Sequence, residues 1–437
     1  MNMADVDIKV SIILPSLNVK DYIEEALDSV IMQSLKDIEI ICVDAGSDDG
    51  TEDIIERYAK KDKRIRFIRS TVRSYGYQVN LGIEASHGKY IAVLETDDKV
   101  ASEMYERLYR LAEDSNADYV KADYNAFFTQ IDGSYYYFER HNFTDKSLYD
   151  VVLEPIKHQV IARDDWYLWQ GIYRREYLNN YGIRFSETPG AAYQDIGFLF
   201  LTGIYAKRAV YIREPLYGYR IDREMASSNS GKGLLYSYAE FDRLIELGKN
   251  FSILRSEEVK RMLYIRMAKS FVSCYGGSVS ATGGYEYREA YQWFCTQLSQ
   301  AIEQGMIDED IVQSGRWARL MTLLDSEEAY FSEFLLNEQT RDFIGSHEKI
   351  AIFGCGDYGY KAYKEVVSGE RTVVAFLDNN KTLWGKILNG IKIESPDTVK
   401  KMDNVVGILI ANESHYDDIR QQLIDYGIHS DRIGQFR

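Results

Sequence analysis

Acidic side chains follow two apolar segments in the first hundred residues of this 437-residue chain. They are Asp44, after residues 38–43, and Glu95, Asp97 and Asp98, after residues 90–94. If both segments are parallel neighbouring strands, their carboxyl ends lie at one edge of a sheet and the acids converge on one crevice. Clustered carboxylates repel one another, and a divalent cation, Mn²⁺ or Mg²⁺, that also binds a diphosphate makes such a cluster favourable. The alternative is that the acids of the second group only cap the next helix.

A glycine-rich loop near the C-terminus is a second candidate site. Gly354, Gly356 and Gly359 form a GxGxxG pattern between an expected strand and an expected helix, and Asp378 ends the next expected strand. Such glycines allow a phosphate to approach the backbone, and the acid can bind a ribose diol. The pattern indicates a nucleotide or NAD site. The alternative, which we favour, is a degenerate loop used for packing or for contact with a partner.

An α/β scaffold must position these residues. Over residues 1–125, strand-like runs alternate with segments of helical period, which is typical of a mainly parallel sheet. Residues 235–345 read as helical, and a fresh strand–helix alternation follows them. We therefore predict an α/β protein with three domains, at residues 1–232, 233–346 and 347–437.

Charge and composition exclude several classes of protein. With 52 basic and 68 acidic residues the net charge is -16, which argues against a nucleic-acid partner. We expect a cytoplasmic protein, because the sequence has no long apolar span and no signal-like start. The four cysteines lack metal-ligand spacing and are predicted to be reduced thiols. We assign His87, His141 and His158 to structure or solvent, since no pair of them has ligand spacing.

The motifs VSIILPSLN, DAGSDDG, NLG and LETDD occur in an order that resembles family 2 glycosyltransferases of the GT-A fold, over about residues 8–225. The resemblance implies that a proline loop and the acid of the second strand line the pocket of a nucleotide-diphosphate sugar. It also implies that the DxD-type motif holds the ribose and a metal ion. The matching positions are Pro15, Ser16, Asn18, Asp44, Asn80, Glu95 and Asp97 for the nucleotide sugar, and Asp97 and Asp98 for the metal.

The segment ETPGAAYQDIGF is similar to the acceptor side of the same family, which makes Asp195 the matching general base. Gln194 stands where the family more often has Glu. The segment LYGYRIDREMASS resembles the part that folds over the donor, and the matching diphosphate contacts are Arg220, Ser227 and Ser228. The alternatives are purely structural: Asp195 is a helix N-cap, and Arg220 is a surface arginine. Trp169 and Tyr173 form either an acceptor wall or core packing.

The departures from the family pattern leave the nucleotide base open, because Ala45 follows Asp44 where a second acid is common. The C-terminal residues resemble Rossmann-like modules appended to bacterial polysaccharide enzymes. Together the resemblances imply an inverting, metal-dependent transferase in cell-surface polysaccharide or glycoprotein glycan synthesis. Its acceptor would be a glycan, lipid-linked or protein-linked hydroxyl, at the inner face of the membrane. A non-catalytic sugar-nucleotide scaffold and an NAD-dependent oxidoreductase are the competing hypotheses, and peripheral membrane contact and a homo-oligomer stay open.

Overall fold

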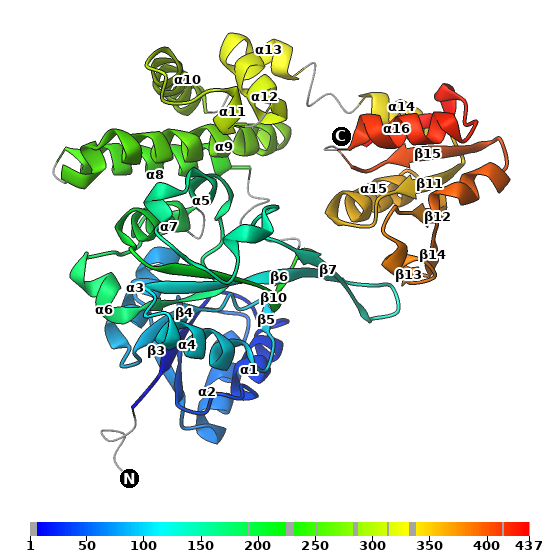
Figure 1. Cartoon of the computed structure of the whole chain (residues 1–437). Coiled ribbons are helices and arrows are strands. Elements are labelled where there is room, and N and C mark those ends of the chain that lie inside the picture. Colours follow the sequence, from blue (N-terminus) through cyan, green and yellow to red (C-terminus); the bar gives the residue numbers. More distant parts are fainter. Residues whose placement is uncertain are drawn as a thin grey trace. The chain divides into compact units, whose positions relative to one another are not determined.

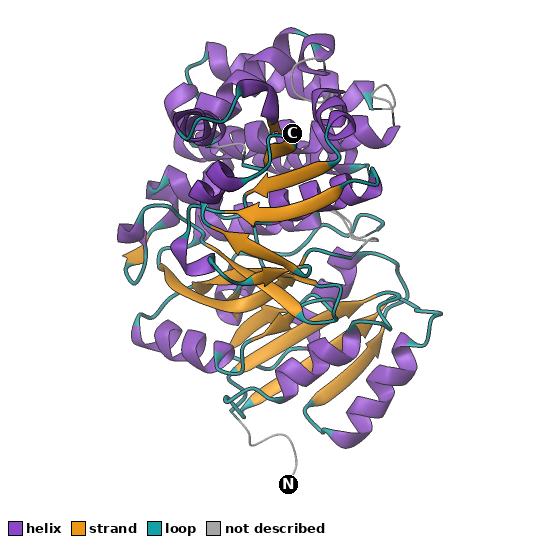
Figure 2. Ribbon diagram, turned by 90° about the vertical axis from the view of Figure 1, so that its right-hand side faces the viewer, coloured by secondary structure: helices purple, strands orange, loops and turns teal. Residues whose placement is uncertain are grey.

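The computed structural model describes residues 7–190, 193–223, 231–249, 252–282, 287–312, 314–331, 338–412 and 415–436. It divides into two compact units. Unit 1 comprises residues 1–126 and 139–317, and unit 2 comprises residues 127–138 and 318–437. Both units combine a sheet with covering helices, so the predicted α/β class is confirmed (Figures 1 and 2). Within the described ranges, no helix combines the length and apolar character needed to cross a bilayer.

The central sheet of unit 1 has the strand order β3-β2-β1-β4-β9-β6-β10-β5. Its first four members in this order are parallel, as the sequence predicts, whereas β9 runs antiparallel to both β4 and β6. The strands are β1 (Val10–Ser16), β2 (Ile38–Asp44), β3 (Ile65–Arg69), β4 (Tyr90–Val93), β5 (Lys99–Val100), β6 (Tyr119–Thr129), β9 (Gly171–Arg174) and β10 (Ala209–Arg220), with β7 (Tyr135–Arg140) beside β6 and β8 (Val152–Leu153) beside β10.

Continuous apolar runs explain why β1 and β2 lie at the centre of this sheet. Every residue of both strands is buried, as expected of parallel strands covered on two faces. In α1 the buried residues are Ile23, Ala26, Leu27 and Val30, which follow the period of one helix face. The helices of unit 1 are α1 (Ile23–Ile31), α2 (Thr51–Lys61), α3 (Tyr75–Ala85), α4 (Met104–Asp114), α5 (Gln159–Asp164), α6 (Arg175–Asn180), α7 (Gln194–Tyr205), α8 (Gly233–Gly248), α9 (Glu257–Thr282), α10 (Arg288–Glu303) and α11 (Glu309–Val312).

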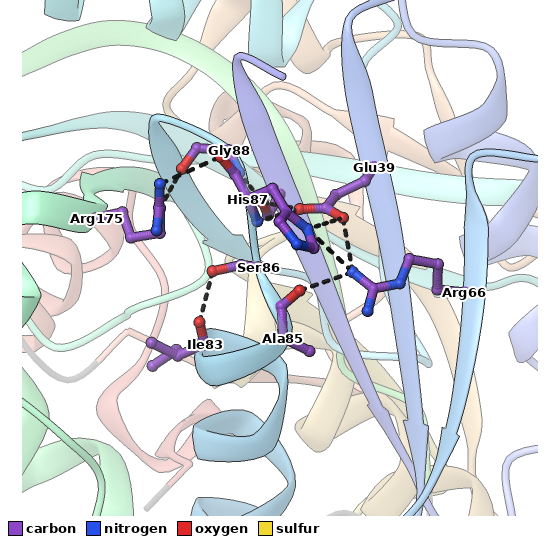
Figure 3. Close-up of polar contacts among 9 residues, drawn as sticks. Glu39, Arg66, Ile83, Ala85, Ser86, His87, Gly88 and Arg175 are labelled. Atoms are coloured by element: carbon purple, nitrogen blue, oxygen red, sulfur yellow. Dashed lines mark hydrogen bonds and ion pairs between the residues drawn. The ribbon is translucent and has the colours of Figure 1, made fainter. Parts of the chain in front are cut away.

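A buried carboxylate ties the amino ends of these strands together (Figure 3). Glu39 is 1% exposed and accepts hydrogen bonds from Ser11 Oγ at 2.6 Å and from the His87 backbone N–H at 2.6 Å. Arg66 adds an ion pair of 3.0 Å. Burial opposes ionisation, but these partners outweigh it and lower the pKa of Glu39. His87 is thus part of a structural network at the sheet edge opposite to the carboxyl ends of the strands, as the sequence assignment expected.

Unit 2 contains a six-stranded sheet with the order β13-β14-β12-β11-β15-β16. The strands β11, β12 and β15 are parallel and carry the apolar core of the unit. Gly354 has a φ of +115°, and a Cβ there would lie 2.7 Å from the Ala411 carbonyl oxygen, so only glycine fits. The elements are α12 (Ser314–Asp325), which crosses the division, α13 (Glu327–Tyr330), α14 (Glu338–Ser346), β11 (Lys349–Phe353), α15 (Asp357–Ser368), β12 (Thr372–Leu377), β13 (Ile387–Leu388), β14 (Ile391–Glu394), β15 (Val406–Ile410), α16 (Tyr416–Asp425) and β16 (Ile433–Gln435).

Candidate active site

A cavity of about 300 Å³ lies in unit 1 at the carboxyl ends of β1 and β4. This is the edge at which open α/β sheets bind ligands. Segments far apart in the sequence meet there: the end of β1, the β4–β5 loop, the start of α7 and the end of β10. The predicted site residues that line the cavity are Pro15, Ser16, Glu95, Asp97, Asp98, Asp195 and Arg220.

Asp44, Asn18 and Asn80 lie outside the lining of this cavity. Asp44 is fully buried and accepts hydrogen bonds from Ser16 Oγ at 2.8 Å and from the backbone and side chain of Ser47 at 2.8 and 2.7 Å. Asn80 donates to the Phe185 carbonyl at 3.1 Å and accepts from its N–H at 3.1 Å. These side chains hold the backbone beside the cavity, and the nucleotide contacts predicted for them stay predictions.

Glu95 and Asp195 are two partly buried carboxyl groups whose environments differ. Burial raises the pKa of Glu95 to about 8, against a hydrogen bond that Tyr75 Oη donates to Glu95 Oε1 at 2.5 Å. Burial raises the pKa of Asp195 only to about 6, because backbone N–H groups in the first turn of α7 lower it again. The pKa of Glu95 thus lies above that of Asp195, so Asp195 ionises first as the pH rises. The N-cap position of α7 is Tyr193, and Asp195 lies in the first turn of the helix.

The two aspartates of the β4–β5 loop have different partners. Asp97 Oδ2 lies 2.9 Å from Arg223 Nη1, and both side chains remain partly exposed at the cavity. Asp98 is 2% exposed; Tyr217 Oη donates to its Oδ2 at 2.8 Å and the Arg220 N–H to its Oδ1 at 2.7 Å. Each oxygen of Asp98 therefore already accepts one hydrogen bond in a buried position, whereas Asp97 is more accessible and pairs with Arg223.

The arginine at the cavity that sequence reasoning missed is Arg223. Arg220 does line the cavity, but its guanidinium donates to the Asp97 carbonyl at 2.9 Å and to Glu25 Oε2 at 2.5 Å, so it braces the loop. Arg223 lies three residues after Arg220, in the same segment that resembles the donor-covering part of the family. A second arginine in this segment was the sequence feature that could have identified it. Ser227 and Ser228 lie outside the described residues.

Comparisons with known proteins match this geometry. Residues 11–167 fit the model of glycosyl transferase family 2. The chain is 36% identical over 212 residues to the uncharacterized glycosyltransferase EpsJ of Bacillus subtilis, covering 48% of this chain and 60% of that protein. Residues 11–167 form a family 2 glycosyltransferase domain. The chain spans about 60% of the length of this curated relative.

Two further comparisons extend beyond this domain. The uncharacterized glycosyltransferase YibD of Escherichia coli is 25% identical over 364 residues, covering 78% of this chain and 96% of that protein. The structure of S. aureus TarS 1-349 in complex with UDP-GlcNAc matches with a TM-score of 0.52 at 17% identity, covering 76% of this chain and 92% of that one. This likeness shows the fold, which is the predicted GT-A type. Residues 346–434 fit a separate family model described as C2185-like, N-terminal.

An aromatic wall borders the cavity beside these acidic residues. Trp169 is 5% exposed and stacks on Tyr219 with centroids 5.1 Å apart and planes at 9°, and on Tyr167 at 4.9 Å and 29°. All three residues line the cavity. Tyr173 is outside the lining and packs edge-on against Phe198 at 5.2 Å, so it belongs to the core. Tyr167 and Tyr219 carried no sequence signal beyond the local richness in tyrosine.

A buried ion pair anchors this wall to the sheet. Lys121 on β6 is 1% exposed; its Nζ lies 2.6 Å from Asp165 Oδ1 and donates to the Tyr167 carbonyl at 2.9 Å. Tyr211 Oη donates to the other oxygen of Asp165 at 2.8 Å. The segment that carries the aromatic wall is thereby fixed to the centre of the domain.

A divalent cation fits the donor set of the site. Among the described residues, no three His, Cys, Asp or Glu side chains gather closely enough to hold a metal ion by themselves. Mg²⁺ and similar ions, however, are usually bound by one or two carboxylates together with substrate phosphates. Asp97 offers one carboxylate at the cavity, so it can hold such an ion once a diphosphate is present.

In unit 2, Gly354 and Asp378 line a separate cavity of about 290 Å³, while Gly356 and Gly359 lie outside its lining. Asp378 Oδ1 accepts from the Asn380 N–H at 2.8 Å, and Oδ2 accepts from the Cys355 N–H at 3.2 Å. Both oxygens that would bind a ribose diol therefore already have backbone partners. Nucleotide binding by this loop stays a prediction.

Proposed function

We propose that unit 1 transfers a sugar from a nucleotide-diphosphate donor to a hydroxyl group of a glycan, lipid-linked or protein-linked acceptor, with inversion at the anomeric carbon. The observation that supports this proposal most directly is that Glu95, Asp97 and Asp195, from two distant segments, line one cavity bordered by aromatic rings. A cell-surface polysaccharide or glycoprotein glycan is the proposed product, made at the inner face of the membrane.

Asp195 is the proposed general base. Its pKa of about 6 keeps it ionised at neutral pH and close to the pH at which a base works best. It takes the proton of the acceptor hydroxyl as the oxygen attacks the anomeric carbon, and the bond from that carbon to the donor diphosphate breaks. The aromatic wall of Tyr167, Trp169 and Tyr219 offers apolar faces to the acceptor sugar and excludes water.

Asp97 and Arg223 are proposed to stabilise the departing nucleoside diphosphate. A divalent cation held between Asp97 and the diphosphate supplies charge neutralisation there when it is bound. Arg223, released from Asp97, presents a guanidinium that suits phosphate oxygens. Protonated Glu95 adds no further negative charge beside the diphosphate and can donate a hydrogen bond to the donor.

The test replaces the proposed base while keeping its shape. Asp195→Asn should reduce sugar transfer by at least about a hundredfold, because the amide cannot accept the proton, a role worth roughly 10²–10⁴-fold in general. Donor binding should be retained, and thermal shift with UDP-GlcNAc, GDP-mannose and dTDP-glucose plus Mn²⁺ measures it. UDP-GlcNAc comes first because TarS was crystallised with it.

The matched control is Asp53→Asn, which removes a carboxylate from the exposed face of α2 and should leave transfer unchanged. Wild-type turnover in the Asp195→Asn variant would remove this residue from the mechanism. A wild-type chain that binds a donor but neither transfers nor hydrolyses its sugar would instead support the scaffold hypothesis.

A further inference from the structure

We propose that a second groove of unit 1, at the opposite end of α7 from Asp195, binds an uncharged glycan chain. This α6–α7 groove has a volume of about 340 Å³, and its lining includes Tyr181, Tyr205, Arg174, Asp118 and Arg208. None of these residues lines the cavity of the candidate active site. The preference for long acceptors, which is argued below, rests on the proposed function, whereas glycan binding itself does not.

An exposed aromatic stack is the first observation. The rings of Tyr181 and Tyr205 stack with centroids 4.5 Å apart and planes at 22°, and Tyr177 meets Tyr181 edge-on at 5.6 Å. Tyr181 is nevertheless 46% exposed. Tyrosines of this kind offer an apolar face together with a polar tip, which is the surface that sugar rings pack against while their hydroxyls stay hydrogen-bonded.

Polar groups around the stack are held rigidly. Arg174 Nη2 donates to Asn116 Oδ1 at 2.9 Å and to the Ala117 carbonyl at 2.8 Å, and Arg208 Nε donates to the Ser115 carbonyl at 2.9 Å. The Arg208 N–H in turn donates to Asp118 Oδ2 at 3.0 Å. Polar side chains fixed in advance lose little conformational entropy when they bind hydroxyl groups, so the groove is preorganised for a polar ligand.

The charge of the groove favours an uncharged occupant. Its cations are Arg174, Lys207 and Arg208, and its carboxylates are Asp118 and Glu176. Lys207 Nζ also lies 3.1 Å from Glu154, which pairs with Lys157 as well, so the groove carries a net charge of only about +1. The chain as a whole carries a charge of -16, which opposes the approach of a polyanion. A neutral oligosaccharide therefore fits better than a phosphate-rich polymer.

The distance to the catalytic edge fits an acceptor longer than one sugar. Asp195 lies in the first turn of α7 and Tyr205 ends the helix. At about 1.5 Å of rise per residue the two lie about 15 Å apart along the helix axis. That separation corresponds to a few sugar rings. The groove would thus hold a remote part of a chain whose end accepts the new sugar, and it would favour long acceptors over short ones.

The experiment measures binding of the full chain, without donor, to an array of neutral and phosphorylated bacterial surface glycans. The wild type should retain neutral oligosaccharides. Tyr181→Ala and Tyr205→Ala should weaken that binding at least tenfold, while Tyr181→Phe, which keeps the ring, and Tyr358→Ala, an exposed tyrosine of unit 2, should not. Asp195→Asn should bind glycans like the wild type, so a failure of the catalytic proposal leaves this result unaffected.

The proposal is wrong if no glycan is retained, if only phosphorylated glycans are retained, or if both alanine variants bind as tightly as the wild type. Stabilisation by UDP-GlcNAc and Mn²⁺, where the wild type shows it, should be equal in all of these variants. A variant that loses this stabilisation along with glycan binding indicates a general structural defect and overturns the assignment to that residue.

Discussion

Two carboxyl groups at the candidate site differ in pKa although burial acts on both. Burial raises both pKa values; helix N–H groups lower that of Asp195 again, whereas Tyr75 and Arg223 offset only part of the rise for Glu95, to which Asp97 and Asp195 add. Pairs of acids whose environments push their pKa values apart mark acid and base roles in enzymes. The structure therefore favours Asp195 over Glu95 as the base, a distinction that sequence spacing cannot make.

The pH dependence of transfer follows from this difference. Asp195 must be ionised to accept a proton, so kcat/KM should be constant above its pKa of about 6 and fall about tenfold per pH unit below it. Initial rates between pH 4.5 and 7.5, with saturating Mn²⁺ and a stability check at each pH, measure this. A profile that stays flat down to pH 5 would contradict the assignment.

Asp97 and Asp98 should separate into a ligand-binding and a structural residue. Asp97→Asn should weaken Mn²⁺-dependent donor binding at least tenfold, because the carboxylate at the cavity is lost, with an unchanged melting temperature. Asp98→Ala should cost about 1–3 kcal/mol of stability, because it leaves the buried donors Tyr217 Oη and Arg220 N–H unpaired. Calorimetry and urea unfolding test the pair, and the opposite pattern would restore Asp98 as the metal ligand.

At the scale of elements, β6 supports the acceptor side through Lys121. Lys121→Met should destabilise the protein by about 3–5 kcal/mol, since it leaves Asp165 buried without its cation. It should also raise the KM for the acceptor, because the backbone of Tyr167 loses its anchor, while the KM for the donor changes little.

Lys157→Met is the matched control for that experiment. Lys157 forms an ion pair with Glu154, but its side chain is 70% exposed, so neither stability nor kinetics should change measurably. Equal effects of the two substitutions, or an equal rise in both KM values for Lys121→Met, would show that the anchor has no specific role in the aromatic wall.

Elements with a continuous or strictly periodic pattern were predictable from the sequence. The strands β1 and β2 and the buried face of α1 follow from their apolar runs. β6 extends to Thr129, beyond the alternation expected over residues 1–125, and the antiparallel β9 was not predicted, because pairing partners are decided by tertiary contacts. The positions of the acidic site residues were predictable from the sequence. The hydrogen bonds to both oxygens of Asp98 and the pairing of Arg223 with Asp97 depend on contacts with distant segments.

At the scale of the molecule, residues 233–317 of the helical segment belong to the same compact unit as the sheet that carries the candidate site. Glu240 on α8 raises the pKa of Asp195 and Arg266 on α9 lowers it, so charges on both helices act on the site. The three predicted domain boundaries stay predictions.

Truncated chains test the predicted domain boundaries. A chain that ends after residue 312 should still show donor-induced stabilisation, while a chain that ends after residue 232 should not. The shorter chain loses Arg266, whose Nη2 donates to the Asp165 carbonyl at 2.6 Å, and Lys269, whose Nζ donates to the Arg163 carbonyl at 2.8 Å. Circular dichroism and thermal shift with donor measure both. A stable, donor-binding chain of 232 residues would show instead that the first predicted domain folds alone.

We expect the pair formed by Arg223 and Asp97 to make the binding of the two proposed ligands of the site, a divalent cation and a nucleotide sugar, depend on each other. A cation that binds alone must compete with the Arg223 guanidinium for Asp97. A nucleotide that binds alone must compete with Asp97 for the Arg223 guanidinium. When both ligands bind, Asp97 pairs with the cation and Arg223 pairs with the diphosphate, so both side chains keep a partner of opposite charge. Occupancy by one ligand therefore increases the affinity for the other by the same factor, whichever binds first.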